Sequence, residues 1–513
     1  MKPEIKIIDT LKRAVSEIVQ KQVSSLREMN YLDLRLGIHE FKSARSENGI
    51  SKEAVDDYEA SFGIRVIAGE LASWGFYGQS LGKKDLNERD LAQLLLSGID
   101  TACGRARANA KRKSEFKKIA HALAEVRLAE IKVCQDTIPA DFDIDPRGVP
   151  LQKILKTTVN TSLQMKALDP SVQFAAATIR TGITRELFCS SEGAVIDQSL
   201  PVTQGVVYLS AQQGEAIPEV GYDYIGDVRG WEVIEGKNCY NCSFLDFALE
   251  RTRDTVELAG AEFLKTTEEE VVVVTNPHYN TLLVHEIVGH PAEADRVLKM
   301  ETAYAGRTWL FESPERNELE NRVASPLVNA FSDPTRMGYG YYTYDAEGTP
   351  AKAIAVIKDG ILKTFLNGRE TAAILGHKPN GSMRATVPSM VPLVRMTNTI
   401  FGPGRKDPEH IIKEVKDGYY IHNHRTPSIS ESRENFRISA QKVYKIENGK
   451  LGKLYRGGGI MANSKDFLMN VDAAGNDFKM FPIPNCGKGQ PMQIMRVGNG
   501  GPTLRSKARL AGC

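Results

Sequence analysis

The chain has 513 residues, of which 42% are hydrophobic and 25% charged, a composition typical of a globular protein with room for two to four domains. Its formal net charge of +2 does not favour a polyanion or an anionic surface, so we expect neither a nucleic-acid nor a membrane partner. No apolar run approaches a membrane span, residues 1–5 open no secretory signal, and seven cysteines in so long a chain suit a reducing compartment; we expect a cytoplasmic protein.

The N-terminal part shows a helical pattern followed by strand patterns. Apolar residues recur at helical spacing over residues 5–29, and alternation by twos follows over residues 31–36 and 62–77, with Asn48-Gly49 as a turn signal between them. These patterns predict a helix packed on a small antiparallel sheet.

Asn87 is a candidate cap for a second helix, whose apolar residues run from Leu91 to Ile99 and which continues into a basic run over residues 105–118. Such a run could contact nucleic acid. Because it lacks regular aromatic interleaving and the chain is not basic overall, we interpret it as a solvated helix face. The alternative predicts binding with a steep salt dependence.

Residues 139–150 are rich in proline and aspartate and are interpreted as a connector. Charged and glycine-bearing loops cluster between Glu215 and Lys237, where we place the boundary between an N-terminal domain, residues 1–225, and a C-terminal domain, residues 226–513. The other elements predicted here are helices over residues 151–168 and 245–258 and strands over residues 172–179, 186–190 and 206–211.

The C-terminal part is predicted to be rich in strands. A buried strand over residues 271–274 runs into Asn276-Pro277, an N-cap followed by proline at the first helical position. Asp359-Gly360 and Asn448-Gly449 read as hairpin tips, and another helix begins at Asp407-Pro408. The predicted fold class is therefore α+β, with N-terminal helices packed on a small sheet and a C-terminal strand-rich domain that carries the helix after Asn276.

That helix carries His285-Glu286-Ile287-Val288-Gly289-His290, with its two histidines five residues apart. Zinc proteases commonly place two histidines four apart on one helix face, with a glutamate as general base. A straight helix would put His285 and His290 roughly 140° apart. Two irregularities would bring them together: a π-type turn, or a helix that ends near Gly289 with His290 at its cap and Pro291 barring continuation. The backbone freedom of Gly289 makes either easier. The alternative is an ordinary helix whose histidines are satisfied by hydrogen bonds.

Two histidines do not complete a catalytic zinc site, which usually has three protein ligands. Cys486 lies between small, flexible residues in Asn485-Cys486-Gly487-Lys488-Gly489, and a thiolate is an excellent zinc ligand. The alternative is a plain buried cysteine. Because 486 − 285 = 201 residues separate Cys486 from His285, spacing alone does not connect them.

Cys239-Tyr240-Asn241-Cys242 is a second cysteine feature. The pair could be redox-active or form half of a structural zinc site. No second such pair and no thioredoxin-like context accompany it, so chance or structural cysteines are favoured.

Several further segments follow the histidine motif in a fixed order: the turn over residues 345–350, Arg395-Met396-Thr397-Asn398-Thr399, Gly475-Asn476-Asp477, Asn485-Cys486-Gly487-Lys488 and Gly501-Pro502-Thr503-Leu504-Arg505. Together they resemble the TldD/PmbA family of metalloproteases, and in particular its metal-carrying, TldD-type members. The resemblance is good from Val271 onward and weaker upstream, where residues 63–78 and Ser191-Glu192-Gly193 fit best. Inactive partner subunits of that family lack the histidine motif, which this chain has.

The resemblance implies a zinc-dependent peptidase. Zinc (Zn2+) would be held by His285, His290 and Cys486, and Glu286 would be the general base. Family members assemble around an enclosed chamber, as a homodimer or as a heterodimer with an inactive paralogue, so the N-terminal domain would supply chamber walls and dimer contacts. They act on peptides or unfolded protein segments, admitted as added strands.

Two departures from the family accompany the match. Where the family often has Gly-Leu-Glu-Gly-Asp, this chain has Pro291-Ala292-Glu293-Ala294-Asp295, and extra sequence lies around residues 308–321, so we expect substrate entry to differ. Glu293 or Asp295 would either orient a ligand histidine or be a surface acid. A positive group should stabilise the oxyanion, and the sequence does not choose among the candidates Arg395, His278, His422 and His424.

Two other functions remain open at this point. One is a non-catalytic, metal-stabilised peptide-binding or assembly protein, which predicts that Glu286→Gln leaves function intact. The other is an oxidoreductase that uses Cys239 and Cys242, which predicts that Cys239→Ser abolishes activity while the metal content stays unchanged.

Overall fold

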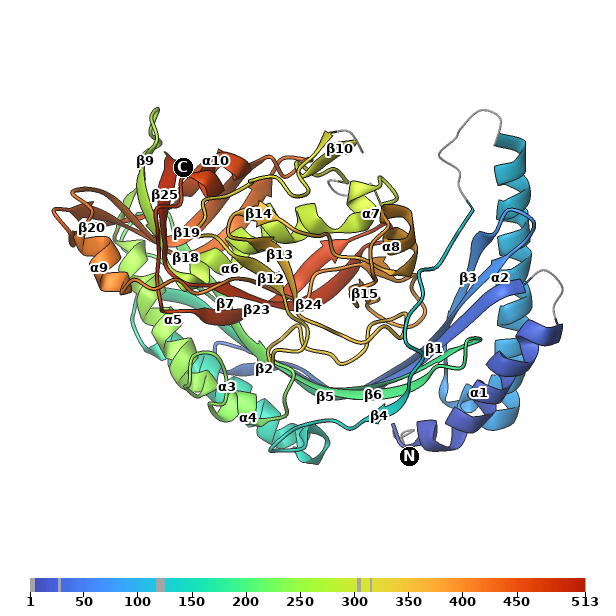
Figure 1. The fold of residues 1–513 in the computed structure, drawn as a ribbon. Helices are drawn as coiled ribbons and strands as arrows, with labels where there is room; N and C mark the ends of the chain where they lie inside the picture. The colour runs from blue at the N-terminus through green and yellow to red at the C-terminus, as the bar shows by residue number, and fades with distance from the viewer. Residues whose placement is uncertain (1–4, 26–28, 117–124, 302–305, 314–315, 513) are drawn as a thin grey trace.

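The computed structural model describes residues 5–25, 29–116, 125–301, 306–313 and 316–512. The chain is α+β, as predicted: helices and a large sheet come first in the sequence, and a strand-rich region follows. Figure 1 shows the first sheet as a curved cradle with helices on its outer face and the strand-rich region on its inner face.

The cradle is a seven-stranded, mostly antiparallel sheet with the order β3-β2-β1-β5-β6-β4, in which β7 also pairs with β6. The predicted small sheet is wrong in size, because β1, β2 and β5 are each 19 residues long and the two strands predicted over residues 172–190 are one. The Asn48-Gly49 turn is confirmed, with φ of 49° and 81°. The strands are β1 (Met29–Glu47), β2 (Ile50–Ala68), β3 (Ser73–Ser80), β4 (Gln135–Ile138), β5 (Val172–Ser190), β6 (Val195–Ala211) and β7 (Glu219–Asp227).

The helices pack on one face of this sheet because the side chains alternate between its faces. On β1, Leu34 and Leu36 join the apolar core beneath the helices, whereas Arg35 and Gly37 face the strand-rich region. Asn87 caps α2 as predicted, accepting a hydrogen bond from the backbone N–H of Asp90 (3.0 Å). The helices are α1 (Ile7–Ser25), α2 (Glu88–Phe116), α3 (Leu151–Ala167), α4 (Glu232–Glu235) and α5 (Phe244–Ala259); residues 26–28 and the basic Lys117 and Lys118 lie outside the described residues.

The inner face of the cradle meets the strand-rich region at glycines. A Cβ added at Gly63 would lie 1.9 Å from the carbonyl oxygen of Pro388, so only glycine permits this approach. Arg35 donates from the same face to the carbonyl of Met390 (2.7 Å). The cradle therefore supports the segment around residue 389 directly.

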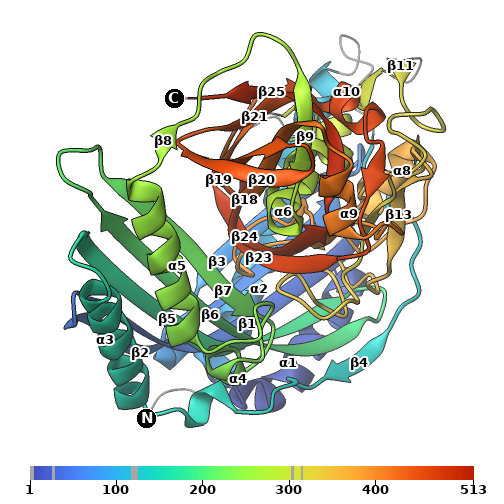
Figure 2. The same ribbon diagram turned by 90° about the vertical axis from the view of Figure 1, so that its left-hand side faces the viewer.

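The strand-rich region contains two larger sheets with α6 between them, where the helix contacts β24 of one sheet and β18 of the other (Figure 2). The six-stranded sheet comprises β12 (Ala330–Ser332), β13 (Ile354–Lys358), β14 (Ile361–Leu362), β17 (Asn398–Phe401), β23 (Lys479–Lys488) and β24 (Gln493–Gly501). The eight-stranded sheet comprises β8 (Glu262–Phe263), β9 (Val271–Thr275), β18 (Asp417–Ile429), β19 (Asn435–Glu447), β20 (Lys450–Arg456), β21 (Gly459–Asn463), β22 (Ala473–Ala474) and β25 (Leu504–Ala511). Short elements complete the region: β10 (Phe311–Ser313), β11 (Arg316–Asn317), β15 (Met383–Arg384), β16 (Leu393–Val394), α6 (Pro277–Val284), α7 (Ala294–Val297), α8 (Arg369–Leu375), α9 (Pro408–Lys413) and α10 (Ser464–Met469).

Both predicted hairpin tips are confirmed, with Asp359 and Asn448 in the left-handed region at φ of 50° and 49°. Residues 215–237, predicted as loops, instead contain β7 and α4. The boundary predicted between residues 225 and 226 falls inside β7, and the division into two domains stays a prediction.

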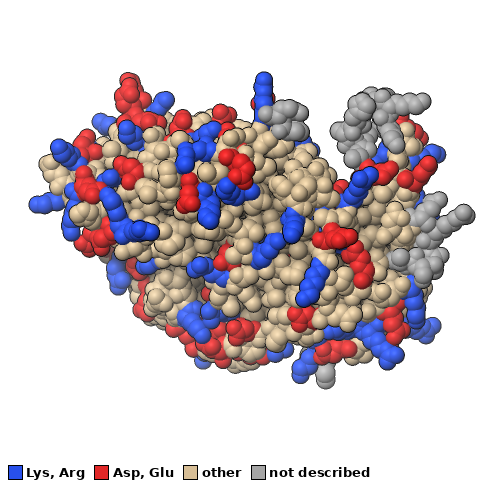
Figure 3. Space-filling view, viewed as in Figure 1, with Lys and Arg blue, Asp and Glu red and all other residues tan. Residues whose placement is uncertain are grey.

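Charged side chains of both signs are interspersed over the face shown in Figure 3. Among the described residues, no helix is both long and apolar enough to cross a bilayer.

Candidate metal centre

The histidine motif is delivered by a strand and a capped helix, as predicted. β9 ends at Thr275, and the side chain of Asn276 accepts a hydrogen bond from the backbone N–H of Tyr279 (2.8 Å) at the start of α6. Pro277 occupies the first helical position. The helix is buried along its length, so the motif lies inside the protein.

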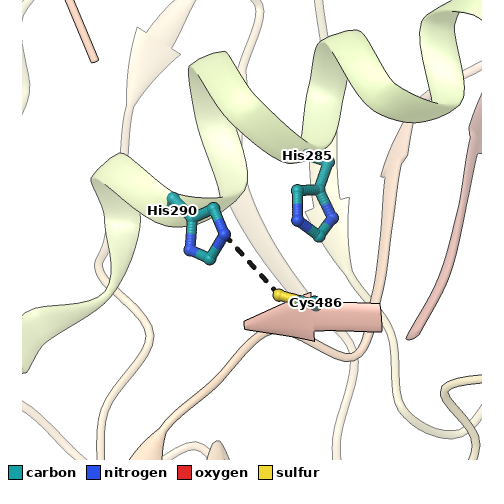
Figure 4. A group of neighbouring side chains, drawn as sticks. All are labelled: His285, His290 and Cys486. Carbon is teal, nitrogen blue, oxygen red and sulfur yellow. Dashed lines mark hydrogen bonds between the residues drawn. The ribbon is translucent and has the colours of Figure 1, made fainter. Parts of the chain in front are cut away.

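A widened helical turn accommodates the five-residue spacing between the two histidines. Residues His285–Gly289 form a π-helix, in which the N–H of His290 donates to the carbonyl of His285, and a 3₁₀ turn over His290–Ala292 ends the helical segment. Both imidazoles consequently project from the same side of the helix toward Cys486 on β23 (Figure 4), with ring centroids 4.8 Å apart. The first of the two predicted irregularities is confirmed, and Pro291 lies within the 3₁₀ turn that follows it.

Gly289 is required for a different reason from the one predicted. Its φ and ψ are both −61°, an ordinary right-handed helical conformation, so backbone freedom is not used. A Cβ at this position would lie 1.9 Å from Sδ of Met396, a fully buried side chain. Glycine is therefore needed to let Met396 pack against the widened turn.

The two histidines and Cys486 come together despite their separation in sequence. Their ligand atoms all lie within 4.8 Å of one another, and Sγ of Cys486 is 3.6 Å from Nε2 of His290. Tetrahedral zinc with bonds of about 2.3 Å to sulfur and 2.0–2.1 Å to nitrogen separates two such ligands by about 3.5 Å. The donor set, and the 3.6 Å between Cys486 and His290, thus fit zinc.

The protonation of the three side chains also suits a metal. Burial lowers the pKa of His285 and of His290 to about 4, so both imidazoles are neutral at pH 7. Burial alone would raise the pKa of the Cys486 thiol, but Arg395 and His290 outweigh it and lower that pKa to about 7. A thiolate and two neutral imidazoles are the protonation states that bind a metal.

Each of the two imidazoles has a polar partner at its Nδ1 nitrogen. Nδ1 of His285 lies 2.7 Å from the side-chain amide nitrogen of Asn499, and Nδ1 of His290 lies 3.0 Å from a carboxylate oxygen of Glu293. These contacts leave Nε2 of His290 directed at Cys486, as expected of an oriented ligand. Of the two acids considered as orienting groups, Glu293 makes this contact.

Glu293 is itself part of a buried ionic network. Nε of Arg296 donates to Glu293 (2.7 Å), and Nζ of Lys488 lies 3.1 Å from Glu293 and 2.6 Å from Asp295. Burial would raise the pKa of Glu293, but Lys488, His290 and Arg296 hold it well below its usual range. The carboxylate beside His290 is therefore ionised at neutral pH.

Cys486 is positioned by the β23–β24 hairpin. Its pairing with Met495 follows a register shift after Ile483, and Arg395 donates to the carbonyl of Cys486 and to that of Gln493 (3.1 Å). Arg395, one of the proposed oxyanion groups, is therefore engaged in holding the hairpin.

The side chain of Glu286 pairs with a residue that was not predicted from the sequence. Its carboxylate pairs with the guanidinium of Arg433, which lies 147 residues further along the chain. Of the histidines considered as oxyanion groups, His278 and His424 stack with their ring centroids 4.6 Å apart, and Nε2 of His278 lies 3.9 Å from a carboxylate oxygen of Asp223. A positive φ at Arg433 is unusual for a non-glycine residue, but the sequence alone does not reveal it.

Comparisons with known proteins find a matching family model and relatives that are named metalloproteases. Residues 268–512 match the model of the PmbA/TldA metallopeptidase C-terminal domain. A metalloprotease of Methanocaldococcus jannaschii is 26% identical over 96% of this chain and 99% of its own length. A metalloprotease of Methanothermobacter thermautotrophicus is 30% identical over 63% of this chain and 66% of its own length, slightly under two thirds of that relative.

The chain belongs to the TldD/PmbA family. Its fold is also that of TldE from Thermococcus kodakarensis, with a TM-score of 0.69 at 15% sequence identity over 99% of this chain and all of the other.

One departure from the family pattern packs against the widened turn. The indole N–H of Trp309 donates to the carbonyl of Ile287 (3.2 Å), and the hydroxyl of Thr308 donates to the carbonyl of Pro291 (2.8 Å). Carbonyls at an irregular helix turn need partners of this kind. The described part of the extra sequence, which omits residues 314–315, thus packs against the widened turn.

The Cys-x-x-Cys pair takes no part in the site. Cys239 and Cys242 are free thiols, and burial raises the pKa of both. Raised pKa values oppose the thiolate character that redox-active cysteines need. The preference for structural or chance cysteines agrees with this.

Proposed function

We propose that this chain is a zinc-dependent peptidase that hydrolyses peptides or unfolded protein segments. The observation that carries the proposal is the convergence of His285, His290 and Cys486, with their ligand atoms within 4.8 Å, at the π-helix that also carries Glu286. Zinc, when bound, supplies a Lewis acid that acts on water and carbonyl groups.

The roles of the side chains follow from their contacts. His285, His290 and Cys486 hold the metal, and Glu293 and Asn499 keep the imidazoles oriented. Glu286 is the general base: one carboxylate oxygen, Oε2, pairs with Arg433, so Oε1 accepts the proton from the attacking water and returns it to the leaving amine.

Peptides of several residues are the proposed substrates. A cavity of about 660 Å³ lies where α2 and β3 meet the strand-rich region, and Asp295 of the buried network is part of its lining. The lining combines apolar side chains such as Trp74 and Leu393 with charged ones such as Arg105 and Glu370, and it includes none of the three proposed metal ligands. Its size suits a peptide side chain or short segment held next to the metal site. We further propose a homodimer or a heterodimer with an inactive paralogue, in a cytoplasmic setting, in which residues 1–225 supply chamber walls and dimer contacts.

A second candidate function is a metal-stabilised peptide-binding or assembly protein that cuts nothing. The pairing of Glu286 with Arg433 favours it, because the guanidinium engages one of the two carboxylate oxygens that a general base would offer to water. This reading predicts that Glu286→Gln leaves function intact.

The experiment measures zinc by elemental analysis and peptide hydrolysis on the same samples of wild type, Cys486→Ala and Glu286→Gln. We expect about one zinc per chain in the wild type, loss of zinc and hydrolysis together in Cys486→Ala, and full zinc with hydrolysis about 100- to 10,000-fold lower in Glu286→Gln. Cys239→Ser is the matched cysteine control and should change neither. Full zinc in Cys486→Ala would refute the ligand set, and unimpaired hydrolysis in Glu286→Gln would refute the peptidase mechanism.

A further inference from the structure

Arg433 lies in the connection between two strands. It belongs to the segment between β18 and β19, where its N–H donates to the carbonyl of Ser430 (2.9 Å). Its carbonyl accepts from the hydroxyl of Ser464 (2.6 Å) at the start of α10. Its φ of 63° is in the left-handed region, a conformation that persists in a non-glycine residue only when its surroundings hold it.

The guanidinium of Arg433 is buried against the carboxylate of Glu286. Its Nη1 donates to Oε2 of Glu286, and only 8% of the residue is exposed. Its Nε–H is buried and has no hydrogen-bond partner within the described ranges. Its charge also lowers the pKa of both His285 and His290, which places it near the metal ligands. Burying a cation with an unfilled donor costs free energy of folding, so its presence calls for an explanation such as a functional role.

The other cations near the metal ligands contact structural partners and not Glu286, although Nε–H of Arg395, like that of Arg433, is buried without a hydrogen-bond partner among the described residues. Arg395 donates to two backbone carbonyls of the β23–β24 hairpin, and Arg296 and Lys488 bind the carboxylate of Glu293. His424 has a pKa lowered to about 3, chiefly by burial, so it carries no charge at pH 7. Arg433 is thus the cation that the structure directs at the general base.

We infer that Arg433 is a catalytic residue whose guanidinium stabilises the oxyanion formed at the substrate carbonyl. This inference rests on the proposed peptidase function. When water attacks, the new C–O bond forms, the carbonyl π-electrons move to oxygen, and the proton passes to Oε1 of Glu286. Arg433 keeps Nη1 on Oε2 of Glu286 and offers its unfilled donor to the oxyanion. The C–N bond then breaks, and Glu286 returns the proton to the amine nitrogen.

The test compares Arg433→Met and Arg433→Lys with wild type and with Arg437→Met. Arg437 lies on β19, is exposed and donates to the carbonyl of Gly512, so its replacement removes the same charge away from the site. Circular dichroism and zinc content establish that each variant is folded and loaded. Arg433→Lys keeps the charge without the planar fork, and it carries the test should Arg433→Met not fold.

Two readouts are taken. With a fluorogenic peptide that the wild type cleaves, we expect Arg433→Met to lower kcat about 100- to 1,000-fold with KM within about threefold, and Arg433→Lys to lower it at least about tenfold. By calorimetry, a tripeptide with a tetrahedral phosphonate in place of the scissile amide should bind Arg433→Met about 100-fold more weakly than wild type, whereas the matched amide peptide should bind both alike. Arg437→Met should behave as wild type in both.

Unchanged kcat and phosphonate affinity in the Arg433 variants would overturn the assignment, as would a gain in activity, which would make the contact with Glu286 inhibitory. Failure of the peptidase function itself has a different signature. In that case zinc-loaded wild type cleaves no peptide and binds phosphonate and amide peptides equally.

Discussion

Lys488 is the residue whose loss should most clearly expose the energetics of the buried network. Its side chain has no solvent exposure, and Nζ contacts Asp295 (2.6 Å), Glu293 (3.1 Å) and the carbonyl of Val394 (2.7 Å). Lys488→Met keeps the length of the side chain but removes its charge. The substitution leaves the carboxylate of Asp295 buried without its closest cation.

Removing one partner of a buried ion pair typically costs about 3–5 kcal/mol. An unfolding entropy of about 2.1 cal/mol/K per residue gives about 1.1 kcal/mol/K for 513 residues, so the melting temperature should fall by about 3–5 °C if the chain unfolds as one unit. Lys479→Met is the matched control, because Lys479 lies on the same strand and is exposed. Its melting temperature should stay within about 1 °C of wild type.

The deficit should depend on pH with a definite sign. In the wild type, burial already raises the pKa of Asp295, and Lys488 opposes that rise, so Lys488→Met raises it further. A group with a raised folded-state pKa destabilises the protein above that pKa, and the penalty shrinks by about 1.4 kcal/mol per pH unit as the group takes up its proton. The gap between wild type and variant should therefore be full at pH 8 and largely close near pH 5. Calorimetric melting at both values measures it; a variant as stable as Lys479→Met at pH 8, or a deficit independent of pH, would refute the reasoning.

Two further predictions concern the widened turn and the ligands. Gly289→Ala should destabilise the protein by about 1–3 kcal/mol because its methyl group overlaps Sδ of Met396, and in denaturant unfolding the double variant with Met396→Ala should be more stable than the sum of the two single changes. If the two changes were simply additive, the overlap with Met396 would not be the cause of the destabilisation by Gly289→Ala. Zinc affinity, measured by chelator competition, should fall about tenfold per pH unit between pH 6.5 and 5, because only the Cys486 thiol, with its pKa of about 7, gains a proton there, whereas His285 and His290, with pKa values of about 4, stay neutral. A slope of two or three protons would mean that the histidines titrate with it.

Local chemistry in the sequence predicted local structure well. Asn276-Pro277 and Asn87 cap the helices that they were expected to cap, and Asp359-Gly360 and Asn448-Gly449 close their hairpins. The π-type turn was one of two irregularities expected from requiring both histidines of one motif to face one metal. Each of these inferences depends on residues within one or two turns of the chain.

Features that depend on contacts between distant parts of the chain could not be predicted from local sequence patterns. The long strand β5 was divided in two because polar residues such as Arg185 interrupt its apolar alternation; in the structure Arg185 pairs with Asp197 on the neighbouring strand. Cys486 could be joined to the histidines only through the family resemblance, and Arg433 carries no motif at all. For both, the deciding information is tertiary packing rather than spacing.

The charged residues buried around His290 are best explained by their effect on the orientation of that imidazole. Glu293, Asp295, Arg296 and Lys488 are all at most 5% exposed, and replacing such groups by apolar residues of similar volume is often neutral or stabilising. Stability alone therefore does not account for retaining them. What apolar side chains cannot supply is a fixed acceptor for Nδ1 of His290, which directs Nε2 toward the thiolate. The network is best understood as the means by which a carboxylate is kept ionised in the interior so that one imidazole holds a single orientation.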